Sequence, residues 1–429
     1  MTIYDLIIVG SGPSSVSFLD GLNHDLNIAI ITGEKGDKTN FRNIHKNISY
    51  KSEITNDHKP CRDFISNISN TKNMLYTSAR IAGLSNYWGK QLIEYNENDN
   101  WPVDFFENYT DYKINCEKVK LNYQFNDFNF KKEIHYNGFN YILESNKLLK
   151  NLKNEHVSNP IKTKFESLIE KKKISVFNNY VVSIKKKKKI SILLDNKINL
   201  NAKKIIISAG VYGTGKILLN SFEDLINFEF KDHDPSFFFY YDKKLKLNYY
   251  NFGFNNLKIF LDHKKKNRLY ENIYKLSKKN FSFLFNYFNL PLLFNKYKIP
   301  KIFDMIIPIQ VWNENSIFNI RVNKKNFFES EKIKTLFDTT YYNNFISLLK
   351  YNGIILKKNK TSPGNGFHYH SLFFSTQKKN QISIAELLFE KFGNDVICID
   401  GSILNKISPI PHSLTLMATA YSIGQKFQI

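Results

Sequence analysis

The sequence predicts an α/β protein, and three stretches carry that prediction. Residues 3–32 read as an apolar strand, a glycine-containing turn, an amphipathic helix and a second apolar strand. Residues 202–221 repeat the order of buried strand, Ala-Gly turn and helix, and residues 396–424 give a last strand followed by a final apolar helix. Strands that alternate with helices in this way predict a parallel sheet covered by helices on both faces.

The turn after the first strand has the pattern of a dinucleotide-binding loop. Gly10 permits a tight turn, Gly12 lets the backbone approach a pyrophosphate, and Ser15 holds the small-residue position where a third glycine commonly stands. Pro13 and Ser14 open the helix whose N-terminal N–H groups would face the phosphates. Because the strand, turn, helix and second strand follow in the required order, the stretch predicts nucleotide binding.

The end of the second strand offers two candidates for contact with the ribose. Glu34 has suitable spacing from Gly10, whereas Thr32 stands where the strand itself ends. A nicotinamide enzyme shares the same first turn, but it would complete its nucleotide domain within the next stretch of sequence. Here matching pieces recur as far as the last residues.

Later segments of the sequence place further candidate ligand-contacting residues in turns and at the ends of strands. Residues 83–89 form a small-residue turn that would bring backbone and the Asn86 amide close to a planar ligand. Residues 174–184 read as two strands that face each other, and Lys185 to Lys189 would form a solvated hairpin tip. The turn Ala209-Gly210 follows one buried strand, and Asp400-Gly401 ends another.

The last helix begins next to a histidine fenced by prolines. Pro409 and Pro411 keep the approach to the helix extended. Ser413 is the expected N-cap, and apolar residues from Leu414 onward repeat at helical spacing. Taken alone, the stretch fits a capped core helix with His412 as a surface loop residue, but the other motifs favour a functional role for His412.

Composition limits the classes of partner. The 429 residues include 42% hydrophobic ones, which fits a globular protein of two domains, and the formal net charge is +22. Only five of the 61 basic residues are arginine, whereas readers of nucleic acid favour arginine for its bidentate fork. We therefore expect no dedicated nucleic-acid binding.

The cysteines and apolar stretches bear on location. Cys61, Cys116 and Cys398 are odd in number and widely spaced, so no disulfide framework or metal cluster is expected. No signal peptide is apparent, and we expect a cytoplasmic protein. Phe281 to Phe294 is too short and interrupted to span a bilayer; it fits a core segment better than one that makes weak contact with a membrane surface.

Together these motifs resemble the glucose–methanol–choline (GMC) family of flavin oxidoreductases. The family's opening glycine motif resembles residues 10–15, its flavin-contacting turn residues 83–89, and its mid-chain strand, Ala-Gly and helix residues 205–219. Its Asp-His pair resembles Asp232-His233, and its C-terminal Asp-Gly-Ser, Pro and His resemble residues 400–412. The sequence departs from the pattern at Ala82, where the family has glycine. It also departs in residues 366–374, which lack the Gly-Thr that usually follows the family's histidine.

The resemblance implies FAD as the cofactor and a set of residues that contact it. The implied contacts beyond the nucleotide turn come from strand ends, small-residue turns and the start of the last helix. The full set is Gly10, Gly12, Pro13, Ser14, Ser15, Thr32, Glu34, Gly83, Ser85, Asn86, Trp88, Val181, Ala209, Gly210, Asp400, Gly401, Ser413 and Leu414. No metal is implied.

The resemblance also implies the reaction and the organisation of the chain. A histidine base would take the proton of an alcohol, from a sugar or another polyol, while the hydride passes to flavin. His412 takes one active-site position, and either His370 or His368 takes the other, with His370 favoured by its preceding tyrosine. His233 would support the FAD-binding domain, a discontinuous Rossmann-like unit of residues 1–232 and 371–429 with a flavin-covering segment at about 76–160. Residues 233–370 would form a substrate domain of sheet plus helix.

Two other functions fit the same motifs. One is a flavoprotein with net-neutral redox chemistry, such as a sugar isomerase, or a ketone reductase. The other is a degenerate flavin-binding protein at a membrane surface. The sequence indicates neither the substrate nor the electron acceptor.

Overall fold

The computed structural model describes most of the chain in segments. These are residues 3–23, 25–33, 75, 77–86, 90–125, 129–145, 148–149, 159–247, 257–261, 269–274, 306–313, 316–325, 328–334, 340–359, 366, 368–377, 381–406 and 408–429. Glu34, Trp88, Cys61 and the stretch Phe281 to Phe294 lie outside them.

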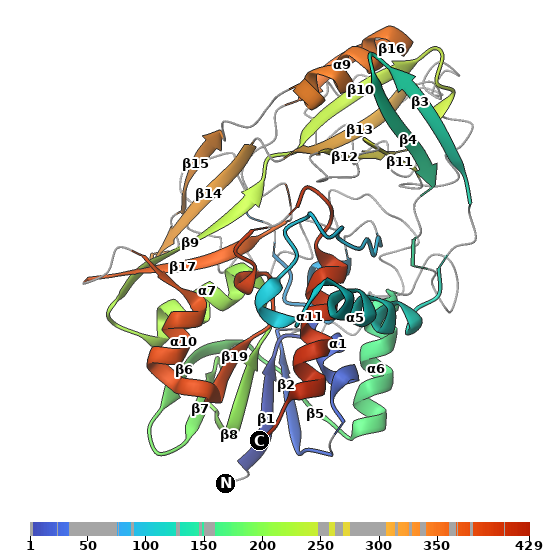
Figure 1. The fold of residues 1–429 in the computed structure, drawn as a ribbon. Helices are drawn as coiled ribbons and strands as arrows, with labels where there is room; N and C mark the ends of the chain where they lie inside the picture. Colours follow the sequence, from blue (N-terminus) through green and yellow to red (C-terminus); the bar gives the residue numbers. More distant parts are fainter. Residues whose placement is uncertain are drawn as a thin grey trace, which may run out of the picture.

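A mostly parallel sheet forms one half of the molecule (Figure 1). Its strand order is β5 (Ser175–Asn178), β2 (Ile28–Thr32), β1 (Ile3–Val9), β8 (Asn199–Ile207), β7 (Ile190–Leu194) and β6 (Val181–Lys186), and β19 (Val396–Cys398) also pairs with β8. The pairs of β1 with β2 and β8, of β2 with β5 and of β8 with β19 are parallel. The predicted α/β fold class is confirmed.

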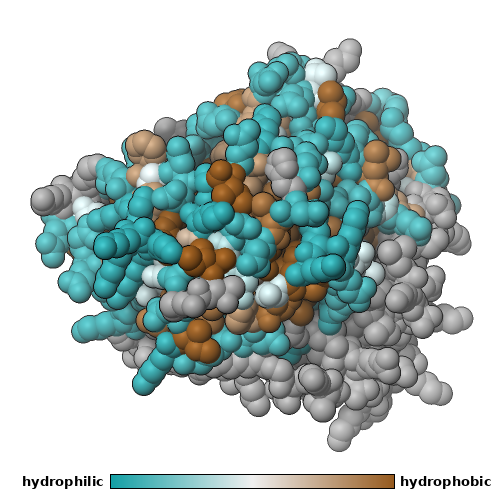
Figure 2. All heavy atoms as spheres, turned by 90° about the horizontal axis from the view of Figure 1, so that it is seen from below, coloured by the Kyte–Doolittle hydropathy of each residue, from teal (hydrophilic) through white to brown (hydrophobic). Residues whose placement is uncertain are grey.

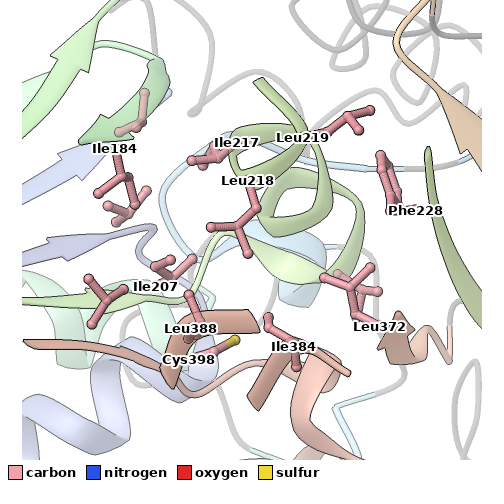
Figure 3. Close-up of a cluster of buried hydrophobic side chains, with 14 of the residues drawn as sticks. Ile184, Ile207, Ile217, Leu218, Leu219, Phe228, Leu372, Ile384, Leu388 and Cys398 are labelled. Carbon is pink, nitrogen blue, oxygen red and sulfur yellow. The ribbon is translucent and has the colours of Figure 1, made fainter. Parts of the chain in front are cut away.

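Helices cover both faces of this sheet because its strands are apolar on both sides. In β1, Leu6 and Ile8 face one core and Ile7 and Val9 face the other. The first core is shared with α1 (Pro13–Gly21), α5 (Tyr109–Leu121), α6 (Pro160–Lys172) and α11 (Ser413–Lys426). The second is shared with α7 (Gly210–Ser221) and α10 (Ile384–Phe392), and Figure 3 shows Leu218 and Leu388 in it.

Helices α1 and α11 pack closely. A Cβ on Gly21 would lie 2.4 Å from the Tyr421 carbonyl oxygen, and one on Gly424 would lie 2.4 Å from that of Phe18. Helix α1 follows β1 directly and so begins at the end of the sheet where β1 ends. Helix α11 begins at the same end and runs back to the C-terminus, which lies beside the N-terminus (Figure 1).

A second sheet forms the other half of the molecule. Its order is β16 (Gly353–Asn359), β10 (Ser236–Asp242), β13 (Ile306–Asn313), β12 (Leu269–Ile273), β11 (Leu257–Leu261), β4 (Phe139–Ser145) and β3 (Lys131–Tyr136), all antiparallel. Helix α9 (Thr340–Asn352) buries Phe345 and Leu348 in the core of this half. Strands β3 and β4 therefore belong to the same sheet as strands from residues 236–359, although they come from the segment predicted to cover the flavin.

A third sheet links the halves (Figure 1). Its order is β15 (Phe328–Lys334), β14 (Ser316–Asn323), β9 (Leu225–His233), β17 (His370–Thr376) and β18 (Ile382–Ser383). Strand β9 follows α7 directly and ends at His233, close to the predicted domain boundary. The boundaries themselves stay a prediction.

The prediction that the two strands of residues 174–184 face each other is wrong. Strand β5 pairs with β2, whereas β6 pairs with β7 in a hairpin near the opposite edge of the same sheet. The hairpin prediction holds, because Lys186 and Ile190 are paired and the lysines between them are exposed.

The surface seen from below is mostly hydrophilic, with apolar side chains between the hydrophilic ones (Figure 2). None of the described helices is both long enough and apolar enough to cross a membrane. Of the three cysteines, Cys116 and Cys398 are buried free thiols.

Candidate active site

The turn after β1 has the geometry that its glycines predict. Gly10 has φ +102°, and a Cβ there would lie 2.1 Å from the Ser208 carbonyl oxygen at the end of β8. The Ser15 hydroxyl donates to the Gly10 carbonyl at 2.9 Å, so Ser15 secures the turn from the first turn of the helix. Only glycine fits at residue 10.

The start of α1 is open. Gly12 is its N-cap, no side chain caps it, Pro13 stands at its first position, and its first turn holds no acidic residue. A Cβ on Gly12 would meet no atom of the described residues within 4 Å. Space and uncapped helix N–H groups therefore coincide next to Ser14, where an anionic group would be stabilised.

The turn of η1 (Gly83–Asn86) lies against this loop. The Ala82 N–H donates to the Ser11 carbonyl at 3.0 Å, and a Cβ on Gly83 would lie 3.7 Å from Gly12 Cα. Ala82 has φ +71°, so alanine occupies here a conformation that favours glycine. The departure from the family pattern at this residue therefore leaves the backbone of the turn in a glycine-like form.

Ser85 and Asn86 use their side chains inside the protein. The Asn86 amide donates to the Ile81 and Gly83 carbonyls, both at 2.9 Å, and accepts from the Asn159 amide at 3.0 Å. The Ser85 hydroxyl donates to the Ala82 carbonyl at 2.6 Å. Both donor hydrogens of Asn86 are thus taken, and the amide shapes the turn, which leaves backbone to contact a ligand.

Asn159 was not among the predicted site residues. Its amide also donates to Ser85 Oγ at 3.0 Å, while its oxygen accepts from the Ile161 N–H and caps α6. An Asn-Pro pair before a helical stretch is a capping signal that the sequence does contain. Its contact with residues 85–86 depends on tertiary structure.

Thr32 and Val181 lie at strand ends of the first sheet. Thr32 is buried at the end of β2, and its hydroxyl donates to Asn178 Oδ1 at 3.1 Å. Val181 is buried at the start of β6.

Helix α7 also begins without a cap. Ala209 is its N-cap with no side-chain hydrogen bond, and Gly210 has φ +73° with nothing within 4 Å of a Cβ.

The predicted N-cap of α11 is wrong by one residue. His412, not Ser413, is the N-cap, and its carbonyl accepts from the Leu416 N–H at 3.0 Å. Its side chain makes no capping bond, and no acidic residue stands in the first turn. Leu414 is fully buried in the core, so the ring of His412 and the backbone of Ser413 remain at the mouth of the helix.

Asp400 holds the end of β19 together. Its Oδ1 accepts from the Ser402 N–H at 2.9 Å and from the Ser402 hydroxyl at 2.5 Å, and its Oδ2 accepts from Thr214 Oγ1 at 2.6 Å. Burial raises the pKa of this carboxyl, and the hydrogen bonds from Ser402 and Thr214 oppose that rise. A Cβ on the next residue, Gly401, would lie 2.4 Å from the Tyr369 carbonyl oxygen, so this turn packs directly on the histidine-bearing segment.

Four histidines from three segments meet near the start of α11. The His412 ring lies 5.2 Å from the His368 ring, edge to face, and His368 lies 5.5 Å from His233 in the same geometry (centroid distances). The Trp312 indole is stacked on His368, with ring centroids 5.6 Å apart and planes 15° apart. The structure thus brings His368, rather than His370, against His412.

His370 faces its own segment. Its Nδ1 lies 3.0 Å from the His368 carbonyl oxygen, and its ring lies 5.9 Å from that of His233. Because a carbonyl only accepts, His370 carries its hydrogen on Nδ1. His370 therefore holds the peptide of His368, although the sequence favoured it as the partner of His412.

Burial keeps these histidines neutral. It lowers the pKa of His412 to about 3, helped by repulsion from His233, and that of His233 to about 4. It also lowers the pKa of His368 and of His370 well below the usual value, with repulsion between the neighbouring rings adding to the effect. Nδ1 of His233, His368 and His412 is buried and has no hydrogen-bond partner within the described part of the chain. A neutral ring keeps a lone pair on one nitrogen that can accept a proton, and the lowered pKa makes each ring a weaker base than an exposed histidine.

Within the described residues, no group of histidine, cysteine and acidic side chains has the geometry of a metal site. Trp312 is a site residue that the sequence reasoning missed, because it lies in the part of the chain without matching motifs.

Three solved structures share this fold over nearly the whole chain. Pyridoxine 4-oxidase from Mesorbium loti has a TM-score of 0.56 at 9% identity, covering 99% of each chain. A formate oxidase variant from Aspergillus oryzae has a TM-score of 0.53 at 9% identity, covering 99% of this chain and 97% of that one. A FAD-dependent oxidoreductase from Chaetomium thermophilum has a TM-score of 0.51 at 10% identity, covering 98% of both. At such identities the likeness shows the fold.

The chain matches no protein-family profile and no curated protein sequence.

Proposed function

We propose that the protein is a FAD-dependent oxidoreductase that oxidises an alcohol group of a sugar or polyol, with a histidine taking the proton. The observation that carries the proposal is the neutral His368–His412 ring pair at the mouth of α11, which begins at the same end of the first sheet as α1. Structures that share the fold carry names of FAD-dependent and oxidase enzymes, which supports the class of reaction.

The residues around the open helix starts fit the parts of FAD. The loop of residues 10–15 would hold the pyrophosphate, because Gly12 leaves space and α1 has no capping side chain. The backbone of residues 82–86 and the start of α11 would border the flavin ring. The turn at Asp400 and Gly401 would face the linking chain between ring and phosphates.

Oxidation of an alcohol removes a hydride from carbon and a proton from oxygen. When bound, FAD supplies the hydride acceptor. His412 or His368 supplies the acceptor for the proton, since both are neutral and each has an unpartnered ring nitrogen. The geometry favours His368 over His370 as the second residue of the pair.

The start of α11 adds an electrostatic contribution. Its N–H groups carry partial positive charge, and neither a capping side chain nor an acidic residue neutralises it. Negative charge that develops beside this helix end during the reaction is therefore stabilised.

The sugar or polyol assignment rests on the family resemblance and on the aromatic neighbours of the histidines. The ring centroids of Tyr270 and Trp312 are 5.9 Å apart, and Trp312 stacks on His368. Two large aromatic rings therefore extend outward from the His368 ring. Next to them the Gln91 amide donates to Asn272 Oδ1 at 2.8 Å. Aromatic faces beside neutral amides suit an uncharged, hydroxylated substrate better than an ion.

Anaerobic mixing of the FAD-loaded protein with primary alcohols, secondary alcohols, sugars and polyols tests the proposal. The expected result is bleaching of the flavin by one class. An enzyme with net-neutral redox chemistry would instead turn over its substrate only after the flavin is reduced, without bleaching. Protein that stays folded but colourless after FAD is added would overturn the cofactor assignment.

A further inference from the structure

The end of β9 contacts both segments that carry the proposed active-site histidines. Asp232 and His233 are its last two residues, and their exposed fractions are 0% and 3%. Strand β9 sits between β14 and β17 in the third sheet, so its backbone is fixed on both sides.

Asp232 holds the segment of His368. One carboxylate oxygen accepts from the Gly366 N–H at 2.9 Å and the other from the His368 N–H at 3.0 Å. The segment lies so close that a Cβ on Gly366 would meet Asp232 Oδ1 at 2.4 Å and the His233 carbonyl oxygen at 2.3 Å. A carboxylate is the side chain that accepts at both oxygens, so Asp232 suits a pair of backbone donors.

His233 holds the segment of His412. Its Nε2 lies 3.2 Å from the carbonyl oxygen of Ser408, four residues before His412. Because the carbonyl only accepts, His233 carries its hydrogen on Nε2 and its lone pair on Nδ1. The Ser408 hydroxyl also donates to Asp99 at 3.2 Å, so the proline-containing approach to α11 is tied at a second point.

We infer that Asp232 and His233 are positioning residues that set the placement of His368 relative to His412, an inference that rests on the proposed function. Consecutive Cα atoms of a strand are about 3.8 Å apart, so two segments distant in sequence are anchored to neighbouring points of one rigid element. The dipeptide acts through backbone contacts, without itself taking the substrate proton. It supports the histidine pair, whereas the family resemblance assigned His233 to support of the FAD-binding domain.

Variants of Asp232 and His233 separate support of the histidine pair from support of the FAD-binding domain. Asp232→Asn keeps the shape of the side chain but presents an N–H₂ group to one of two backbone donors. We expect it to slow flavin reduction by about 10–100-fold with little change in the substrate concentration for half-maximal rate, because misplacement of about 1 Å costs that much. Glu229→Gln, on the same strand but paired with the exposed Arg321, is the matched control and should react at the wild-type rate.

His233 offers a rescue test. Gln can donate an N–H to the Ser408 carbonyl, whereas Leu cannot. We expect His233→Leu to lose about 10–100-fold in the rate of flavin reduction and His233→Gln to lose less than about tenfold. If Asp232→Asn fails to retain FAD, this pair decides the inference. Equal rates for the Leu and Gln variants would overturn the role of His233.

A measurement that needs no turnover separates this inference from the proposed function. Ring nitrogen NMR signals of ¹⁵N-histidine report the chemical surroundings and tautomer of each ring. Asp232→Asn should shift the His368 and His412 signals, and Glu229→Gln should not. Shifted signals in a protein that no alcohol reduces would contradict the proposed function and leave the positioning intact. Unshifted His368 and His412 signals would overturn the inference whatever the activity.

Discussion

At the scale of the residue, the site is built from glycines that shape the turn after β1 and from histidines whose rings meet at the start of α11. Gly10 and Gly12 stand in a motif whose strand and helix neighbours are local, so their roles follow from the order of residues. His368 and His370 are two residues apart, and their local sequence cannot say which ring meets His412. The contact depends on Trp312 and β9, which are distant in sequence.

The open space at Gly12 gives a test of the cofactor loop. Because none of the described residues has an atom within 4 Å of a Cβ there, Gly12→Val should leave the melting temperature of the FAD-free protein nearly unchanged. The branched side chain would fill the space needed by the pyrophosphate, so FAD should be lost on gel filtration. Flavin absorbance per chain measures this, and a yellow Gly12→Val protein would remove the loop from the site.

At the scale of the element, apolar strands bounded by turns could be predicted from the sequence, but the strands with which they pair could not. Strands β5 and β6 are separated by two residues, which favours a hairpin in sequence reasoning. In the structure β5 extends the parallel side of the sheet next to β2, because α6 returns the chain to that edge. Pairing across a sheet is decided by such crossovers, which leave little local signal.

An unusual element-scale feature is the carboxyl of Glu271 on β12. It is fully buried in the second sheet, neither oxygen has a hydrogen-bond partner among the described residues, and burial raises its pKa well above the usual value. The folded protein therefore binds a proton here that the unfolded chain releases above its pKa near 4.5. The ionisation of Glu271 in the unfolded chain therefore lowers the free energy of unfolding as the pH rises above about 4.5.

Replacing the carboxyl of Glu271 tests the direction of this pH dependence. Glu271→Gln should raise the free energy of unfolding at pH 7 by about 1–3 kcal/mol, and the gain should shrink toward zero near the pKa of the unfolded chain. Urea unfolding at several pH values measures it. The exposed Glu133 on β3 gives the control Glu133→Gln. A gain that is independent of pH would mean that the charge of Glu271 has no part in it.

At the scale of the molecule, the α/β class and the order of motifs were predictable, whereas the second sheet was not. The sequence between residues 233 and 360 carries no matching motif, and most of its strands belong to an antiparallel sheet completed by β3 and β4 from an earlier segment, whereas β14 and β15 belong to the third sheet. The histidine cluster depends on the third sheet, since its rings come from β9, from β17 and the residue two before it, and from the start of α11. Sequence could name all four histidines, three of them as catalytic candidates, but not their arrangement.

The buried cluster predicts the pH dependence of the reaction. Burial lowers the pKa of His412 to about 3, so the ring stays neutral, and able to accept a proton, well below the pKa near 6.5 of an exposed histidine. The rate constant of flavin reduction should therefore stay within about twofold between roughly pH 5.5 and 8. Stopped-flow measurement across that range checks it. A half-maximal rate near pH 6.5 would contradict a buried neutral base.

The rate of anaerobic flavin reduction in wild type and His412→Ala tests the central claim most directly. The account predicts that the substrate bleaches the wild-type flavin, and that the Ala variant stays folded and yellow but is reduced about 10²–10⁴-fold more slowly, the usual contribution of one general base. His412→Asn should lose less, since its amide keeps a hydrogen bond to the substrate oxygen. Equal bleaching rates for wild type and His412→Ala on the same alcohol would contradict the account.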